Sequence, residues 1–205
     1  MAGRLVIATP SGDAWADLDV AEDATKLLVI GHGAGGSVGS ADLLAVTQRC
    51  VQAGISVARV TQPYRVAGKR APPNAVTLDA AWQAVIRALG DRKSLAEQSF
   101  IYAGRSSGAR VACRCAADGT LRPRPIGVVA LAFPVHPPGK PEVLRTGELD
   151  SVSVPVLVVQ GDRDPFGMPG RRRGRKIVVV PGDHSLKQAA PQVGDTVARW
   201  LSTLT

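Results

Sequence analysis

The chain alternates short apolar runs with longer segments of helical spacing, and this succession limits its possible folds more than any other feature. The apolar runs are residues 26–33, 54–60, 99–103, 126–133, 155–161 and 176–182. The segments of helical spacing are residues 41–53, 76–89, 107–117 and 187–204. Alternation of this kind predicts a mostly parallel sheet with helices on both faces, so we expect an α/β fold.

Two further runs at the N-terminus have a different pattern. Residues 4–9 and 14–20 are separated by Pro-Ser-Gly-Asp, a turn sequence, and they predict an antiparallel hairpin at one edge of the sheet. The length of 205 residues suits one domain, residues 1–205, and is too short for two domains of ordinary size.

Composition narrows the class of protein. The cysteines Cys50, Cys113 and Cys115 fit neither a disulfide framework nor a zinc spacing, so we expect no metal and no cofactor. The net charge is +8, but aromatic residues make up only 4% of the chain, which disfavours nucleic-acid binding. The N-terminus has no signal-peptide core, and no run is long enough to cross a bilayer. We expect a cytoplasmic protein without membrane contact, while the sequence leaves the oligomeric state open.

Residues 104–108, Gly-Arg-Ser-Ser-Gly, lie between an expected strand and an expected helix. They match Gly-x-Ser-x-Gly, in which a strained turn lifts the serine hydroxyl clear of the sheet. The same turn directs the first helical amides, including that of Ser107, toward a developing oxyanion. So short a pattern also fits an ordinary turn, so Ser106 is a candidate nucleophile only if a base and an acid accompany it.

The chain has three histidines, and only His184 follows both the serine and a suitable acid. The order serine, acid, histidine is the one that accompanies such a serine turn. Asp164 ends the preceding apolar run within Gly-Asp-Arg-Asp, and we expect its carboxylate to orient His184. Asp162 and Asp183 are alternatives, but such loop carboxylates more often cap backbone amides.

The sequence Gly-His-Gly-Ala-Gly-Gly-Ser follows the first buried run and has neither a Walker lysine nor a dinucleotide spacing. Beside a serine nucleophile, such a loop supplies the second oxyanion amide. We expect that amide to come from Ala34, with Gly33 close to it. His32 is expected to hold the loop in shape rather than to transfer protons.

Several linked stretches resemble the alpha/beta hydrolases, and the resemblance covers nearly the whole chain: GHGAGG, PYRVAGKRAPP, GRSSGARVA, GDRDPFG and PGDHSL. The chain is similar, more narrowly, to a small bacterial branch akin to dienelactone hydrolases, whose relatives include a subunit of a chromatin-acetylating complex. The resemblance implies that Ser106 is the nucleophile, Asp164 the acid and His184 the base. It also implies an oxyanion hole formed by the amides of Ala34 and Ser107.

The chain departs from this pattern at residues 166–176, where a helix would usually lie. The sequence FGMPGRRRGRK is too rich in glycine and proline to form a good helix. Residues 133–155 leave no room for a cap, so we expect a shallow, open site suited to small esters. The candidate substrate-binding residues are Tyr64, Arg65 and Phe166, and other candidates for the rim are Phe133, His136 and Met168.

These features predict a metal-free serine hydrolase acting on a small-molecule ester, thioester or related acyl compound. The alternative is a non-catalytic binding or scaffold protein that retains the hydrolase fold. Residues 171–176 form a basic cluster with two interpretations. It is either a solvated face or, together with Arg65, Lys69 and Arg70, a means of attracting anionic substrates to an open site.

Overall fold

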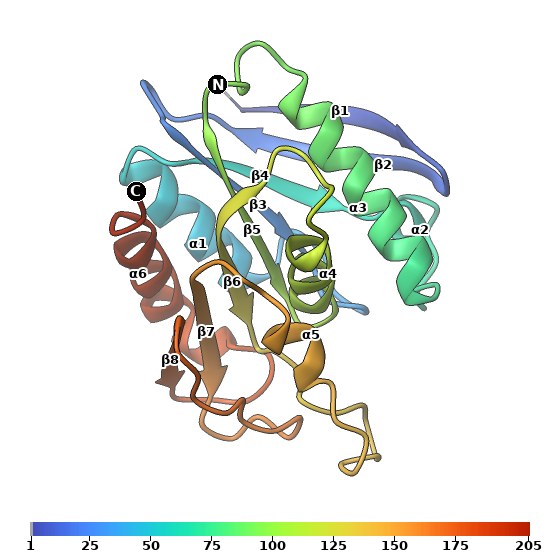
Figure 1. Ribbon diagram of the computed structural model, residues 1–205, viewed down its shortest axis with the longest axis vertical. Coiled ribbons are helices and arrows are strands. Elements are labelled where there is room, and N and C mark those ends of the chain that lie inside the picture. The colour runs from blue at the N-terminus through green and yellow to red at the C-terminus, as the bar shows by residue number, and fades with distance from the viewer. Residues whose placement is uncertain (1) are drawn as a thin grey trace.

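The computed structural model describes residues 2–205 and contains one sheet of eight strands (Figure 1). The strands are β1 (Ala2–Thr9), β2 (Gly12–Asp19), β3 (Lys26–Gly31), β4 (Ser56–Thr61), β5 (Ser99–Arg105), β6 (Pro125–Leu131), β7 (Val156–Gly161) and β8 (Arg175–Val180). Their order is β1-β2-β4-β3-β5-β6-β7-β8. β2 is antiparallel to both β1 and β4, and all other neighbours are parallel. The predicted α/β fold and its antiparallel hairpin at one edge are confirmed.

Helices cover both faces of this sheet (Figure 1). The helices are α1 (Ala41–Gln52), α2 (Pro63–Val66), α3 (Ala75–Gly90), α4 (Ser107–Ala117), α5 (Thr146–Asp150) and α6 (Ala190–Leu201). α1 and α6 pack against each other on one face, while α3, α4 and α5 lie together on the other. The central strands are therefore buried on both sides, as their continuous apolar sequences require.

Strand β5 shows how one sequence serves two cores. Phe100 and Tyr102 belong to the apolar cluster beneath α3 and α4, and the ring of Tyr102 meets that of Trp82 edge-on at 6.3 Å. Ile101 and Ala103 belong to the cluster beneath α1 and α6. Because successive side chains of a strand point to opposite faces, β5 anchors both layers and fixes the position of the residue that follows it.

Several elements differ from the sequence expectation. The short helices α2 and α5 were not predicted, because one turn of helix is too short to show an apolar periodicity. The expected helix 187–204 begins with a short 3-10 helix (Lys187–Ala189) and becomes regular only in α6. Residues 166–174 contain no helix, as their composition predicts. Between Phe133 and Pro155 the only helix is α5, so the single domain carries no cap.

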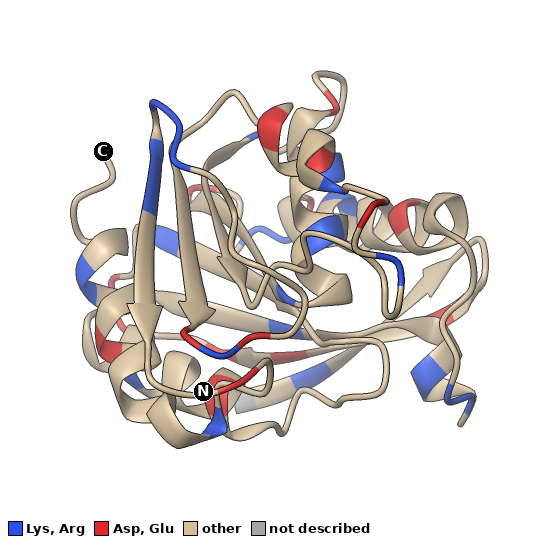
Figure 2. Cartoon of the chain, turned by 90° about the horizontal axis from the view of Figure 1, so that it is seen from below, with Lys and Arg blue, Asp and Glu red and all other residues tan. Residues whose placement is uncertain are grey.

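The parallel strands define two edges of the sheet. We call the edge at their C-terminal ends the carboxyl edge and the opposite one the amino edge. Arg175 begins β8 and pairs with Val156, which begins β7, so the basic residues 171–176 lie at the amino edge. Figure 2 shows this run of basic residues at the tail of a strand arrow, away from its head. The interpretation that it acts together with Arg65, Lys69 and Arg70 at the end of the sheet where the site lies is wrong, because the extended crossover carries it to the other end of the sheet.

Candidate active site

Ser106 lies in a strained turn between β5 and α4. Its φ of 55° and ψ of −112° are unusual for a residue other than glycine. The flanking glycines permit the turn: a Cβ at Gly104 would collide with the backbone of Gly108. A Cβ at Gly108 would lie 2.7 Å from the carbonyl oxygens of Gly31 and His32. The sequence therefore folds locally into an elbow that presents Ser106 at the carboxyl edge.

The structure brings Ser106, His184 and Asp164 together in one hydrogen-bonded chain. Nε2 of His184 lies 2.8 Å from Oγ of Ser106, and Nδ1 lies 2.9 Å from Oδ2 of Asp164. The side chain of Asp164 is 1% exposed and that of His184 is 18% exposed. A buried carboxylate on Nδ1 favours the tautomer in which Nε2 is free to accept the serine proton.

Three donors hold the carboxylate of Asp164 in place. Besides His184, Nε2 of Gln160 donates to Oδ2 at 2.9 Å, and the amide of Phe166 donates to Oδ1 at 2.9 Å. Gln160 is fully buried in β7, and the same nitrogen lies 3.1 Å from the carbonyl oxygen of Phe133 and 2.9 Å from that of Gly167. Gln160 was not singled out from the sequence, although a lone polar residue in the apolar run VLVVQG is a usable signal.

The alternative carboxylates serve the loops instead. Oδ1 of Asp162 accepts the amide of Gly182 at 2.8 Å. Oδ1 of Asp183 accepts the amide and the hydroxyl of Ser185, and these hydrogen bonds lower the pKa of Asp183 from its usual value. Neither contacts the imidazole of His184, so only Asp164 occupies the position of an orienting acid.

The glycine-rich loop after β3 packs directly on the elbow. A Cβ at Gly33 would lie 3.4 Å from Cβ of Ser106, so this glycine keeps the loop close to the serine. The amide of Gly36 donates to the carbonyl of Gly33 at 3.1 Å and closes a turn around Ala34. Ala34 and Ser107 both line the same cavity as Ser106, where their amides were expected.

His32 and Tyr64 support this loop from behind. Nε2 of His32 accepts the amide of Gln62 at 3.1 Å, which leaves Nδ1 to donate to the carbonyl of Gly33 at 2.8 Å. Burial lowers the pKa of His32, and the charge of Arg65 acts in the same direction, whereas the hydrogen bond to the carbonyl of Gly33 raises it. The hydroxyl of Tyr64 donates to the carbonyl of Ala34 at 2.8 Å. A neutral His32 and a buried Tyr64 thus shape the loop without reaching the cavity.

Arg105, the residue before Ser106, links three segments. Nη2 donates to the carbonyl of His184 at 3.1 Å, and Nε lies 3.7 Å from Oδ2 of Asp42 in the first turn of α1. The carboxylate of Asp42 is buried. The guanidinium also lies against Gly33, where a Cβ would approach Nη1 to 2.9 Å. Arg105 therefore ties the histidine loop to the glycine-rich loop beneath Ser106.

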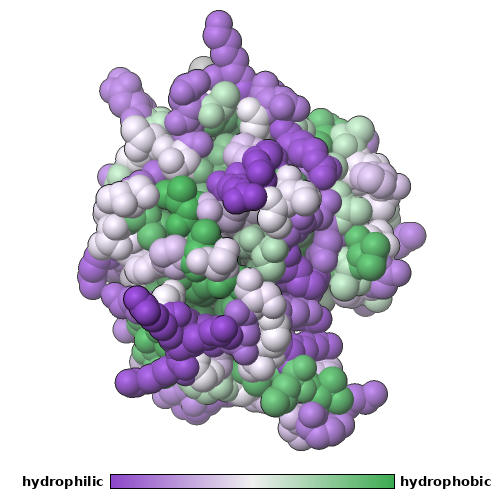
Figure 3. All heavy atoms as spheres, in the orientation of Figure 1, coloured by the Kyte–Doolittle hydropathy of each residue, from purple (hydrophilic) through white to green (hydrophobic). Residues whose placement is uncertain are grey.

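A cavity of about 430 Å³ opens over Ser106. Its lining residues are Ala34, Gly35, Pro72, Arg105, Ser106, Ser107, Arg110, Pro134, Pro138, Arg145, Phe166 and His184. The ring of Phe166 meets the imidazole of His184 at 4.4 Å. The loop that contributes Pro138 and Arg145 also exposes Val143 and Leu144, and Figure 3 shows hydrophobic surface on this projecting part of the molecule.

Not every expected rim residue reaches this cavity. Phe166 lines it, whereas Tyr64 lies behind the glycine-rich loop and Arg65 donates to the carbonyl of Lys69 within its own loop. Phe133 is fully buried, and His136 packs against Phe166 rather than lining the cavity. Met168 is exposed outside the lining. The arginines of the lining were not identified from the sequence, although Arg110 follows Ser106 by one helical turn on α4.

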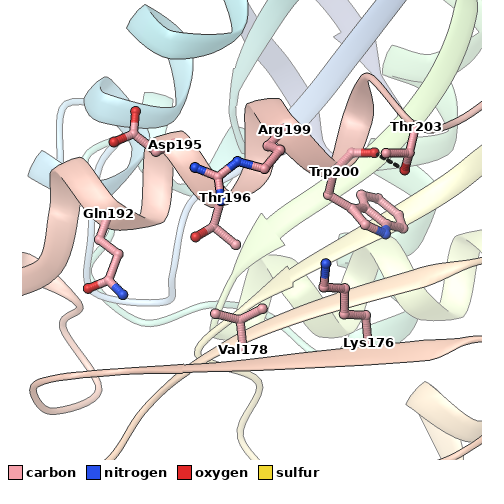
Figure 4. A pocket seen from close by; sticks show the side chains of 8 residues that line it. All are labelled: Lys176, Val178, Gln192, Asp195, Thr196, Arg199, Trp200 and Thr203. Atoms are coloured by element: carbon pink, nitrogen blue, oxygen red, sulfur yellow. Dashed lines mark hydrogen bonds between the residues drawn. The ribbon is translucent and has the colours of Figure 1, made fainter.

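A second cavity, of about 560 Å³, lies between β8 and α6. Figure 4 shows Lys176 and Val178 of β8 opposite Asp195, Arg199 and Trp200 of α6. It contains no nucleophile paired with a base, so it does not compete with the first cavity as a catalytic site.

Within residues 2–205, no three His, Cys, Asp or Glu side chains gather in a way that could hold a metal ion. No helix in the described chain has the length and apolar character needed to cross a membrane.

Comparison with solved structures shows the same fold. Est1E from Butyrivibrio proteoclasticus, solved with ferulic acid bound, has 18% identity and a TM-score of 0.82 over 98% of both chains. Dienelactone hydrolase from Anabaena variabilis has 17% identity and a TM-score of 0.79 over 100% of this chain and 98% of its own. An alpha-beta serine hydrolase homologue from Coxiella burnetii has 18% identity and a TM-score of 0.76 over 97% of both chains.

No curated protein sequence matches the chain. A family model described as alpha/beta hydrolase domain matches residues 24–202, which is nearly everything after the N-terminal hairpin. The matched region contains the strained serine elbow, the buried acid and the histidine that joins them. By this match the chain belongs to the alpha/beta hydrolase domain family.

Proposed function

We propose that the protein is a serine esterase that cleaves a small ester, thioester or related acyl bond through an acyl-enzyme on Ser106. The observation that carries the proposal is the hydrogen-bonded chain from Oγ of Ser106 through His184 to the buried Asp164. Family membership and the esterases among its structural neighbours support hydrolase activity. Nothing in the arrangement requires a metal or a cofactor.

In the first half of the reaction, Oγ of Ser106 attacks the acyl carbon while its proton passes to Nε2 of His184. The imidazolium is stabilised by Asp164. The oxyanion is bound by the amides of Ala34 and Ser107. The bond from the acyl carbon to the leaving oxygen or sulfur then breaks, and the leaving group takes the proton from Nε2.

In the second half, a water molecule attacks the acyl-enzyme and gives one proton to His184. The bond from the acyl carbon to Oγ breaks, Ser106 recovers its proton from Nε2, and the carboxylic acid leaves. A cavity of about 430 Å³ fits small acyl compounds rather than long chains. Est1E, a neighbour in fold, was solved with ferulic acid, a small carboxylic acid of the kind such a cavity could release.

Covalent labelling by a fluorophosphonate probe tests the nucleophile directly. We expect the protein to be labelled and Ser106→Ala to lose the label while keeping its circular dichroism spectrum. Ser202→Ala is the matched control, because its hydroxyl bonds the carbonyl of Ala198 at the end of α6. Equal labelling of Ser106→Ala would exclude Ser106 as the nucleophile.

The same experiment addresses the scaffold alternative. A correctly folded protein that is not labelled at any pH from about 6 to 9, a range over which histidine bases act, would favour a non-catalytic role. Location in the cytoplasm remains a prediction, which cell fractionation can check.

A further inference from the structure

The wall of the catalytic cavity carries an excess of positive charge. Arg110 of α4 forms a two-pronged ion pair with Glu148 of α5, with distances of 2.7 and 2.6 Å. Arg114 pairs in the same way with Asp79, at 2.7 Å for both bonds, and reaches Glu148 at 3.1 Å. With Arg145, this cluster contains three guanidinium groups but only two carboxylates.

The unbalanced charge is on Arg145. Among residues 2–205, no carboxylate forms a salt bridge with its guanidinium and no side-chain hydrogen bond involves it, whereas Arg110 and Arg114 have both. Burial lowers the pKa of Arg145 from its usual value, and the charges of Arg110 and Arg114 lower it further, against the raising effect of Glu148. Such a group gains stability when an anion approaches.

Arg145 is also held at a defined place on the cavity wall. Its amide donates to the carbonyl of Val135 at 2.7 Å, and its own carbonyl accepts the amide of Glu148 at 3.2 Å at the start of α5. Arg145 lines the cavity together with Arg110, Arg105 and Ser106. No Asp or Glu appears among the described residues of that lining. The cavity therefore presents cations to its occupant, while the nearby carboxylates, such as Glu148, lie behind the lining and are paired with arginines.

Arg110 can assist at this position. Its Nε and Nη2 are used by Glu148, and its Nη1 donates to none of the described residues. Glu148 thus fixes the orientation of Arg110 while leaving one edge of the guanidinium available. Two guanidinium groups, one immobilised and one unpaired, suit the recognition of a carboxylate.

We propose that Arg145, aided by the free edge of Arg110, binds a carboxylate carried by the substrate, so that the preferred substrates are anionic esters. This inference rests on the proposed esterase function and adds the chemical class of the substrate. The bound carboxylate is remote from the reacting carbon, so it is held equally in the ground and transition states. Its loss therefore raises KM more than it lowers kcat.

Two esters of the same shape test the proposal. Mono-4-nitrophenyl glutarate carries a terminal carboxylate, and 4-nitrophenyl 5-oxohexanoate carries a neutral methyl ketone in its place. The readout is the ratio of kcat/KM for the anionic ester to kcat/KM for the neutral one. We expect this ratio to exceed one and to fall about tenfold in Arg145→Gln, because hydrogen bonds to charged groups are the strong ones.

Arg171→Gln is the matched control. It removes the same unit of charge from an exposed site at the amino edge, so a general effect of net charge would appear in both variants. We expect the control to keep the wild-type ratio. Salt at about 1 M, where the screening length falls to about 3 Å, should lower the ratio in the wild type more than in Arg145→Gln. A wild-type ratio of one, or equal falls in the two variants, would overturn the proposal while leaving the esterase function standing.

A binding measurement separates the two proposals if neither ester is hydrolysed. Glutarate is then titrated into the wild type and Arg145→Gln by calorimetry. Binding to the wild type that weakens about tenfold in Arg145→Gln, as expected for a lost charged hydrogen bond, would support the anion site even though the esterase function had failed. Absent binding, or equal binding to both proteins, would overturn it.

Discussion

The two edges of the sheet carry the same kinds of charged residue but hold them in different ways. At the carboxyl edge, the carboxylates of Asp164 and Asp42 are each 1% exposed and lie against His184 and Arg105. At the amino edge, Arg172 is 55% exposed and its partner Asp150 is 36% exposed. These carboxylates are buried and fixed where chemistry is proposed, whereas the pair of Arg172 and Asp150 at the other edge is left in solvent. The density of charge along the sequence therefore says less about function than the edge at which the charge lies.

Replacing Asp164 should have the largest effect, because it removes the anion that orients His184 without changing the shape of the loop. Asp164→Asn should lower kcat for 4-nitrophenyl acetate by a factor on the order of 10³ or more. Asp162→Asn should stay within a fewfold of the wild type, because Asp162 bonds the amide of Gly182 and does not contact His184. If Asp162→Asn proved the more damaging variant, the acid would have been assigned to the wrong residue.

Replacing Arg105 should have the second largest effect, this time on stability. Arg105→Gln leaves the buried carboxylate of Asp42 without a counter-charge, which should lower the free energy of unfolding by about 3 kcal/mol in a urea titration. The double variant Arg105→Gln/Asp42→Asn should recover most of that loss. Arg49→Gln is the control, since its pair with Asp195 is exposed on both sides and should cost less than about 0.5 kcal/mol. Equal costs for Arg105→Gln and Arg49→Gln would show that burial at the carboxyl edge adds nothing.

Glu148 and Asp150 lie close together in the chain, but Glu148 pairs with arginines of α4 and Asp150 pairs with Arg175 at the amino edge. Low pH should therefore reduce their contributions to stability by different amounts. Burial acts to raise the pKa of Glu148, but hydrogen bonds and charges from Arg110 and Arg114 outweigh it and leave the pKa below the usual 4.5. A carboxylate whose pKa is lower in the folded than in the unfolded protein stabilises the fold at pH values above its unfolded pKa. This stabilisation is lost as the pH falls below about 4.5. Glu148→Gln should therefore flatten the acid limb of a plot of unfolding free energy against pH.

At pH 7 the same variant should lose about 2 kcal/mol, because two guanidinium groups lose an acceptor. Hydrogen bonding from Arg175 lowers the pKa of Asp150 in the same direction, but its carboxylate is more exposed. Asp150→Asn should therefore change the acid limb less. An acid limb that is the same in all three proteins would contradict both assignments.

The smallest effect should come from the basic run at the amino edge. Arg173 is exposed and forms no ion pair with any residue in 2–205. Arg173→Gln should change the unfolding free energy by less than about 0.5 kcal/mol. Arg175→Gln should cost more, because the side chain of Arg175 is buried and bonds Asp150 at 2.6 Å and the carbonyl of Gly170 at 3.0 Å. Thermal unfolding of the two variants would reveal whether any part of this run contributes to the fold.

The sequence predicts the contact among Ser106, Asp164 and His184 because each residue follows from a local rule. The turn around Ser106 is recognisable from its glycines and from the strand and helix on either side. Asp164 and His184 each follow a parallel strand, and parallel strands end at the same edge of a sheet. The contact between them is then a consequence of strand order, which alternation of strand and helix largely determines.

The surroundings of these groups could not be located in that way. Arg145 enters the cavity because a helix of one turn follows it, and α5 is too short to leave a periodic signal. The position of the basic run was predicted wrongly, because the sequence does not show where each residue of an irregular crossover lies between the two ends of the sheet. Once β8 begins at Arg175, every basic residue before it must lie near the amino edge. The positions of side chains that lie on or directly after strands and helices are thus predictable from the sequence, and the positions of side chains within irregular loops are not.

The contact at Gly161 bears on how inactive members of such a family could arise. A Cβ at this position would lie 2.5 Å from the carbonyl oxygen of Gly182 and 2.6 Å from that of Asp183, so the acid loop and the histidine loop meet where only hydrogen fits. Any side chain there would push the two loops apart. A lineage could lose its chemistry by substituting this one glycine and still display serine, aspartate and histidine in order. Distinguishing active from inactive relatives therefore requires inspecting the residue at the end of β7 as well as those at the positions of Ser106, Asp164 and His184.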